Sequence, residues 1–174
     1  GIEQAFVDAR QADPALVEDL SDIMPDGQIF VVYGFDACDP VTLIDSETLL
    51  KETTRSTALG HGACIGTPIP ARKVKTVASE NTEIIGEIHI APLMSGAIPS
   101  HEIPWKSTGD CAWSDDQGRL WLMGRAREKT TVGHQTLWPY ALQLSLCTLE
   151  DVSNAQVRID SENIVVRIEK SLYA

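Results

Sequence analysis

The chain has 174 residues, a length typical of one domain. Lys and Arg contribute 14 positive charges against 25 negative charges from Asp and Glu, so the formal net charge is −11. A nucleic-acid-binding protein generally needs a positive field, so this charge argues against nucleic acid as a partner. Hydrophobic residues make up 43% and charged residues 22%, which is typical of a folded globular protein and not of a disordered chain.

No apolar run approaches the roughly 18–20 residues that a membrane span requires. The first residues also lack the basic and then apolar layout of a signal peptide. The four cysteines form no CxxC pair and no zinc-ligand spacing; they are Cys38, Cys64, Cys111 and Cys147. We therefore expect a cytoplasmic protein without a membrane span, whose cysteines are buried or half-buried free thiols.

The N-terminal segment predicts two short helices followed by a strand. Apolar residues from Ile2 to Ala9 recur at helical spacing, and a second apolar stripe follows Pro14, a residue favoured in the first helical turn. The apolar, β-branched run 28–32 predicts a buried strand. This order is typical of an α/β layer, whose strands often deliver functional loops at their carboxyl ends.

The middle of the chain predicts short strands. Residues 45–56 predict a helix or a polar excursion, and the Gly- and Pro-rich stretch 60–70 predicts a loop. We expect strands at 73–78, 84–90, 111–114 and 119–123, the last two joined by a strong hairpin turn at 115–118. Short strands at this spacing are typical of a small barrel or meander.

The composition changes at the charged segment 124–129. Beyond it, Pro139 opens a predicted helix with Leu142, Leu146 and Leu149 on one face, and a β-hairpin is expected over 155–168. We therefore predict an α+β fold in three parts. These are the edge of an α/β layer with a small distorted β-barrel over 1–124, a hinge over 125–129, and a shortened helix–hairpin domain over 130–174.

Several common catalytic motifs are absent from the sequence. Trp105 stands where an HExxH motif would need its second His, and neither GxSxG nor GxxxxGK[ST] occurs. The glycines between 60 and 66 do not open a helix after a strand, as a dinucleotide-binding turn requires. His61 and Cys64 are interpreted as part of a packed turn in preference to a catalytic or metal pair.

One constellation of residues suggests ligand chemistry. Thr108, Gly109 and Asp110 precede the predicted hairpin, and Arg125 follows it. Glycine lets a backbone approach a ligand closely, and the two oxygens of a carboxylate suit a vicinal diol such as the 2′,3′-pair of a ribose. The planar guanidinium of Arg125 suits the same ribose or a phosphate. The spacing alone equally fits a plain turn residue at Asp110.

The hairpin region resembles the adenylate-forming enzymes, the superfamily of acyl-CoA synthetases, peptide-synthetase adenylation domains and luciferases. Its sequence, STGDCAWSDDQGRLWLMGRARE, is similar to their pattern TGD-L-x-x-x-D-x-x-G-x-L-x-x-x-GR-x-x-[DE]. Four further segments occur in the family's order: QIFVVYGFDACDP, GACIGTPIPARKVKTV, GEIHI and VGHQTLWPYALQLSL. The resemblance covers about residues 14–168.

The resemblance implies roles for individual residues. Tyr33 would stack near the adenine, and Gly34 would let the backbone approach it. Asp110 would hold the ribose hydroxyls, and Arg125 would support the ribose. The alternative for Tyr33 is a buried tyrosine at a strand end. The tryptophans are interpreted first as packing residues.

Some positions depart from the family pattern. Ala37 replaces the magnesium-binding Glu, which leaves Asp36 or Asp39 as the candidate metal ligand. Gln135 stands where the family has a basic residue. Arg127 stands at the position of the family's first hinge acid, and Glu128 follows it. A Ser/Thr/Gly-rich phosphate loop and the family's catalytic lysine have no counterpart within 1–174.

The resemblance therefore implies a portion of an ATP-dependent ligase that activates a small carboxylic acid, fatty or hydroxylated, as an acyl-adenylate. ATP or AMP, Mg²⁺ and coenzyme A would serve the parent enzyme, and this portion would be inactive by itself. The alternative is a degenerate, non-catalytic relative that binds a partner. An incomplete core would leave the strand at 28–32 and the apolar stripes of the first helices exposed, a surface that a homodimer or a complementing chain could cover.

Overall fold

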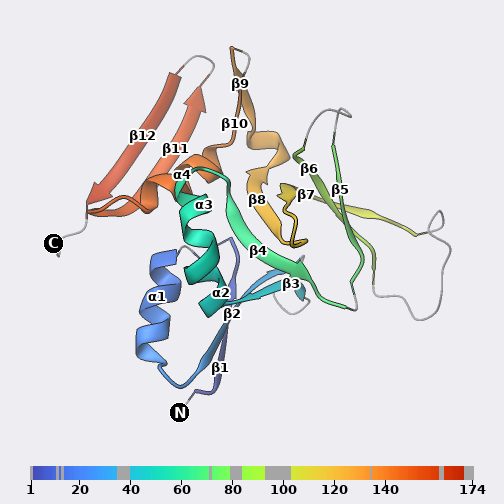
Figure 1. Cartoon of the computed structure of the whole chain (residues 1–174). Coiled ribbons are helices and arrows are strands. Elements are labelled where there is room, and N and C mark those ends of the chain that lie inside the picture. Colours follow the sequence, from blue (N-terminus) through green and yellow to red (C-terminus); the bar gives the residue numbers. More distant parts are fainter. Residues whose placement is uncertain are drawn as a thin grey trace.

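The computed structural model describes residues 2–10, 12, 14–34, 40–70, 72–78, 84–92, 103–133, 135–160 and 163–170. Within these residues, eight strands form one mixed sheet in the order β1-β2-β3-β4-β8-β7-β6-β5 (Figure 1). Two separate two-stranded ladders, β9–β10 and β11–β12, complete the strands. The predicted α+β class is confirmed. None of the helices in these ranges is long and apolar enough to span a membrane.

The predicted first helix is wrong, because its residues form strand β1 (Gln4–Asp8) at the edge of the sheet. β1 runs parallel to β2 (Gln28–Gly34), and the rings of Phe6 and Phe30 stack with their centroids 5.7 Å apart. The backbone hydrogen bonds of this ladder outweigh the helical spacing of the apolar residues. Helix α1 (Pro14–Ile23) and strand β2 confirm the next two predictions.

A helical segment follows strand β3 (Pro40–Asp45). It consists of α2 (Ser46–Thr48), the π-helical turn η1 (Leu49–Thr53) and α3 (Thr54–Ala58). Of the two alternatives predicted for residues 45–56, the structure therefore shows the helix. Asp45 caps its start, because its carboxylate accepts hydrogen bonds from the backbone N and the hydroxyl of Thr48, both at 2.8 Å.

The loop predicted over 60–70 is wrong in its centre, which forms strand β4 (Ala63–Pro68) between β3 and β8. Gly66 has a φ of +79° and passes so close to Leu43 that a Cβ atom would lie 2.1 Å from its carbonyl oxygen. Gly66, which favours a loop in the sequence, thus allows β3 and β4 to approach each other closely. The Thr42 hydroxyl donates a hydrogen bond to the Ile65 carbonyl, which also joins them.

The four strands expected between 73 and 123 are confirmed. They are β5 (Val74–Val77), β6 (Gly86–Ile90), β7 (Lys106–Ser114) and β8 (Leu120–Arg125). Asp115 closes the β7–β8 hairpin by accepting backbone hydrogen bonds from Gln117 at 3.0 Å and Arg119 at 2.9 Å. The strand order is linear, with β1 and β5 as its edges. The described strands therefore form an open sheet, and the predicted barrel is not confirmed.

The last part of the chain begins with a short 3₁₀ turn, η3 (Ala126–Glu128), and the small ladder of β9 (Thr130–Val132) and β10 (Gln135–Leu137). Helix α4 (Pro139–Cys147) follows, and then the expected hairpin of β11 (Val152–Asp160) and β12 (Asn163–Lys170). α4 buries Ala141 and Leu144, not the predicted stripe of leucines, of which Leu149 is 54% exposed.

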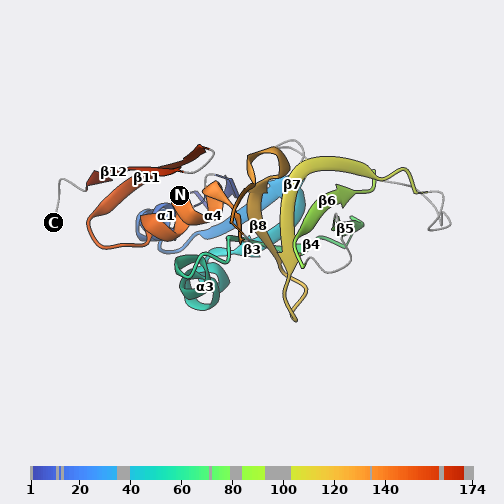
Figure 2. The same ribbon diagram turned by 90° about the horizontal axis from the view of Figure 1, so that it is seen from above.

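Two groups of buried side chains hold the fold together. The main core lies along the sheet and includes Val17 of α1 and Leu144 of α4. A second cluster, made of Cys111, Met123, Trp138 and Ala141, lies between β7–β8 and α4. Seen from above, the β11–β12 hairpin lies at one end of an elongated molecule and β5–β6 toward the other (Figure 2).

Candidate functional site

The β7–β8 hairpin brings the two main candidate residues together. In its antiparallel register Asp110 lies directly opposite Arg125. Such cross-strand neighbours are close enough for their side chains to interact. The Arg125 Nε lies 3.0 Å from Asp110 Oδ1, so the two residues form an ion pair at the open end of the hairpin.

Tyr33 reaches the same carboxylate from strand β2. Residues of β2 alternate between buried and half-buried, and Tyr33 lies on the buried side with Val31. Its hydroxyl donates a 2.8 Å hydrogen bond to Asp110 Oδ2. Tyr33 is 1% exposed and Asp110 is 5% exposed. Residues 77 positions apart in the sequence thus meet at one buried carboxylate.

The part of strand β7 just before Asp110 is fixed by hydrogen bonds that the sequence did not reveal. Gly109 has a φ of +76°, and its backbone N donates to Glu87 Oε1 at 3.0 Å. The Ser107 hydroxyl donates to the same Glu87 oxygen. The Asp110 N donates to Thr108 Oγ1 at 3.1 Å, and Arg125 Nη1 donates to the Thr108 carbonyl at 3.2 Å. Glu87 therefore ties β6 to the part of β7 that positions Asp110.

A pocket of about 190 Å³ opens beside the carboxylate. Its lining residues come from the end of β1, from β7–β8, from η3 and from α4; they are Arg10, Asp110, Leu122, Gly124, Arg125, Glu128 and Tyr140. The Arg10 guanidinium is held by Asp8, with Nη2 3.2 Å and Nε 3.3 Å from its two carboxylate oxygens. Sequence reasoning missed Arg10, because the predicted helix hid its position at a strand end.

The environment sets the protonation of these groups. Burial raises the pKa of Tyr33, and the neighbouring negative charge of Asp110 raises it further, so the hydroxyl stays a neutral donor. Burial opposes ionisation of Asp8, but its hydrogen bonds with Arg10 outweigh this and lower its pKa. The hydrogen bond to Asp8 raises the pKa of Arg10 in turn.

The other predicted site residues lie around this centre or outside it. Gly34 ends β2 and pairs with Pro40. Glu128 lines the pocket, whereas the Arg127 side chain is 84% exposed, with its Nε 3.9 Å from Glu128 Oε1.

The metal candidates Asp36 and Asp39, and Ala37 beside them, lie outside the described residues. The residues that the structure does describe contain no group of three or more His, Cys, Asp or Glu side chains that could hold a metal ion. Gln135 lies in β10.

The tryptophans and cysteines that the sequence assigns to packing lie in the core or contact other side chains. The Trp113 and Trp121 rings stack with their centroids 5.4 Å apart, and Trp113 Nε1 donates to the His61 carbonyl at 2.9 Å. Cys64 and Cys111 are buried and Cys147 is half-buried, as predicted for these three cysteines; Cys38 lies outside the described residues.

No family model matches the chain. An olefin beta-lactone synthetase from Stenotrophomonas maltophilia is 25% identical over 157 residues, which cover 72% of this chain and 28% of that protein. The chloroplastic/peroxisomal 2-succinylbenzoate–CoA ligase of Arabidopsis thaliana is 23% identical over 178 residues, 90% of this chain and 32% of that protein. The chain thus spans less than a third of the length of these relatives.

Among solved structures, the O-succinylbenzoate coenzyme A synthetase of Bacillus subtilis in complex with AMP shares the fold, with a TM-score of 0.68 and 18% identity. The match covers 99% of this chain and 37% of that one. The same synthetase is also known in complex with ATP and a magnesium ion. The chain is thus similar to part of a beta-lactone synthetase and of coenzyme A ligases, in line with the sequence resemblance.

Proposed function

We propose that this chain forms the ribose-binding part of an ATP-dependent ligase that activates a carboxylic acid as its acyl-adenylate. The observation that carries the proposal is the buried Asp110 carboxylate, paired with Arg125 and facing a pocket of about 190 Å³. The relationship to adenylate-forming ligases supports it, as does the AMP complex of a structural neighbour.

The Asp110 carboxylate has acceptor capacity left for a ligand. Each ionised carboxylate offers about four lone-pair positions. Tyr33 takes one on Oδ2 and Arg125 takes one on Oδ1, which leaves one position on each oxygen. The two adjacent hydroxyls of a ribose would donate to these positions. Tyr33 and Arg125 hold the carboxylate still, so little ordering is needed when the ribose binds.

The reaction itself joins two anions. A carboxylate oxygen attacks the α-phosphorus of ATP, pyrophosphate leaves, and an acyl-adenylate forms for transfer to a thiol such as that of coenzyme A. Charge develops on the phosphate oxygens, so donors and cations must be placed there. The described residues contain no cluster of three or more His, Cys, Asp or Glu side chains for a metal, and the candidate Mg²⁺ ligands Asp36 and Asp39 lie outside them. The residues described here bind and orient the nucleotide.

The functional unit divides, in this proposal, at the turn that follows Arg125. Residues 1–124 carry the nucleotide pocket, 125–129 act as a hinge, and 130–174 form a shortened small domain. The acid is fatty or hydroxylated. Residues 1–174 alone lack a phosphate loop, so we expect no carboxylate-dependent ATP–pyrophosphate exchange from them. Robust exchange by this chain alone would contradict that expectation.

Nucleotide binding is tested directly by titrating AMP into ¹⁵N-labelled chain. We expect shifts for backbone signals near Tyr33, Asp110 and Arg125, at millimolar AMP if the affinity corresponds to about −4 kcal/mol. Asp110→Ala should abolish these shifts. Asp116→Ala, at the exposed tip of the same hairpin, is the matched control and should leave them unchanged. Wild-type protein without shifts at saturating AMP would contradict the proposal.

A further inference from the structure

A second and larger pocket lies on the other side of strand β7. Asp110 lines the first pocket and Cys111 lines the second, because neighbouring residues of a strand point to opposite faces. The second pocket has a volume of about 370 Å³, within the range typical of small-molecule sites. The two pockets have no lining residue in common.

The walls of this second pocket are mainly apolar. Cys111 and Trp138 of the second core cluster line it, and Ile85 and Ala126, which pack against that cluster, line it as well. At its margin Ile84 is 79% exposed. A ligand with an apolar body would remove this surface from water, which is favourable by roughly 25 cal/mol per Å².

Two charged side chains line the pocket, and only one of them is available to a ligand. Glu87 is committed to neighbours within the sheet, because its Oε1 accepts from Gly109 N and the Ser107 hydroxyl of β7 and its Oε2 lies 3.8 Å from His89 Nε2. Lys129 is exposed and, within the described ranges, forms no ion pair within 4.0 Å. The cation at the rim therefore favours an anionic head group.

We propose that this pocket binds a small amphipathic carboxylate, with its apolar body against Cys111 and Trp138 and its carboxylate at Lys129. The proposal does not depend on nucleotide binding, because the nucleotide pocket lies on the opposite face of β7. It extends the proposed function by a second ligand site that shares strand β7 with the first.

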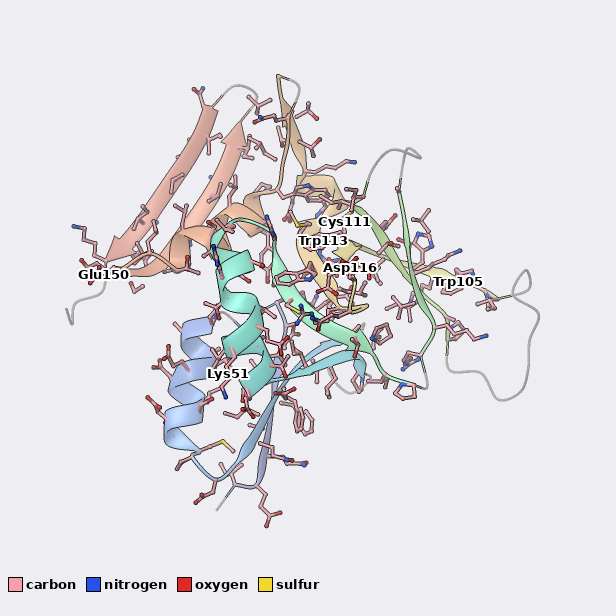
Figure 3. The ribbon with its side chains drawn as sticks, in the orientation of Figure 1. Lys51, Trp105, Cys111, Trp113, Asp116 and Glu150 are labelled. Carbon is pink, nitrogen blue, oxygen red and sulfur yellow. The ribbon has the colours of Figure 1, made fainter. Side chains whose placement is uncertain are left out.

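The thiol of Cys111 allows a local test. In Figure 3, Cys111 is labelled close to β6, β7 and β8, well away from Lys51 on the helical segment. The full chain is treated with the small reagent methyl methanethiosulfonate, and the modification rate of each cysteine is measured by mass spectrometry. The probe is 4-phenylbutyrate, and its uncharged amide is the control ligand. Half-buried Cys147, which does not line the pocket, is the internal control.

We expect 4-phenylbutyrate to slow modification of Cys111 and to leave Cys147 unchanged. The amide should bind about threefold to fivefold more weakly, since a partly exposed ion pair contributes little more than that. Lys129→Ala should remove the advantage of the acid over the amide, and Lys51→Ala, at another exposed lysine, should not.

Three results would overturn the proposal. One is no protection of Cys111 at about 10 mM acid, a concentration above any affinity of interest. Another is equal slowing at Cys111 and Cys147, which would indicate a general effect on the chain. The third is equal protection by the acid and the amide in the wild-type protein, which would show that Lys129 does not bind the carboxylate. Because Lys129 is exposed, Lys129→Ala leaves the core unchanged.

Discussion

At the scale of single residues, two side chains share one buried carboxylate. Asp110 accepts from Tyr33 on one oxygen and pairs with Arg125 on the other. A sequence pattern predicted the partnership of Asp110 and Arg125, because a hairpin turn fixes which residues lie opposite. Arg10 and Glu87 were not predictable in this way, because Arg10 lies in the turn after β1 and Glu87 in β6, both far from Asp110 in the sequence.

The hydrogen bond from Tyr33 can be removed alone. Tyr33→Phe deletes the hydroxyl and leaves a buried carboxylate oxygen without that donor, which should lower the free energy of unfolding by about 1–3 kcal/mol. Tyr140→Phe is the matched control, because the Tyr140 hydroxyl is 3.4 Å from the Ala9 carbonyl and only half-buried. Urea denaturation at pH 7 measures both. A larger loss for the Tyr140 variant would contradict the account.

The same variant tests the raised pKa of Tyr33. Burial and the charge of Asp110 make ionisation harder in the folded state than in the unfolded state, where the pKa is about 10. The protonated Tyr33 hydroxyl therefore contributes its full share of the free energy of unfolding below about pH 10, and this contribution decreases as the pH rises further. The wild type should therefore lose stability as the pH rises above about 10, more steeply than Tyr33→Phe. Parallel curves would show that Tyr33 titrates normally.

At the scale of elements, patterns of apolar residues predicted most strands but misassigned two segments. Residues 4–8 have helical spacing and yet form β1, because the parallel ladder with β2 satisfies their backbone groups. Residues 63–68 contain Gly66 and form β4, because that glycine permits a close approach of β3. Both errors have one cause, since the partner strand decides the structure and a local pattern does not contain it.

Two glycines test this point as a matched pair. Gly66 and Gly118 both have positive φ, but a Cβ at Gly66 would overlap the Leu43 backbone and a Cβ at Gly118 would meet nothing within 4 Å. Gly118→Ala should cost about 1–2 kcal/mol from backbone strain alone. Gly66→Ala should cost more than about 4 kcal/mol, because β3 and β4 must separate. Thermal unfolding measures the difference, and equal costs would contradict the close contact.

At the scale of the whole molecule, one open sheet carries two pockets back to back, and α4 links it to the C-terminal hairpin. Leu144 of α4 lies in the main core, and Ala155 of β11 is 1% exposed. Further along the hairpin, the face that Ala155 shares with β12 is open, with Ile164 48% and Ile168 47% exposed. The sequence predicted this helix and hairpin, but not that α4 would bury itself against the sheet.

Limited trypsin digestion tests the proposed hinge. We expect the first cut after Arg127 or Lys129, because both side chains are exposed and η3 is a single short turn. The two fragments should stay together on gel filtration, because Ala141 and Leu144 of α4 are buried against the rest of the chain. A first cut at Lys106 or Arg119 would place the weak point inside the sheet and contradict the boundary.

The central claim is that Asp110 holds the two hydroxyls of a ribose, and the most direct measurement compares AMP with 2′,3′-dideoxy-AMP. Wild-type protein should bind the dideoxy nucleotide about tenfold or more weakly, since hydrogen bonds to a charged group are lost. Asp110→Ala should bind both nucleotides equally weakly, and Asp116→Ala should behave as the wild type. Equal affinity of the wild-type protein for the two nucleotides would contradict the account.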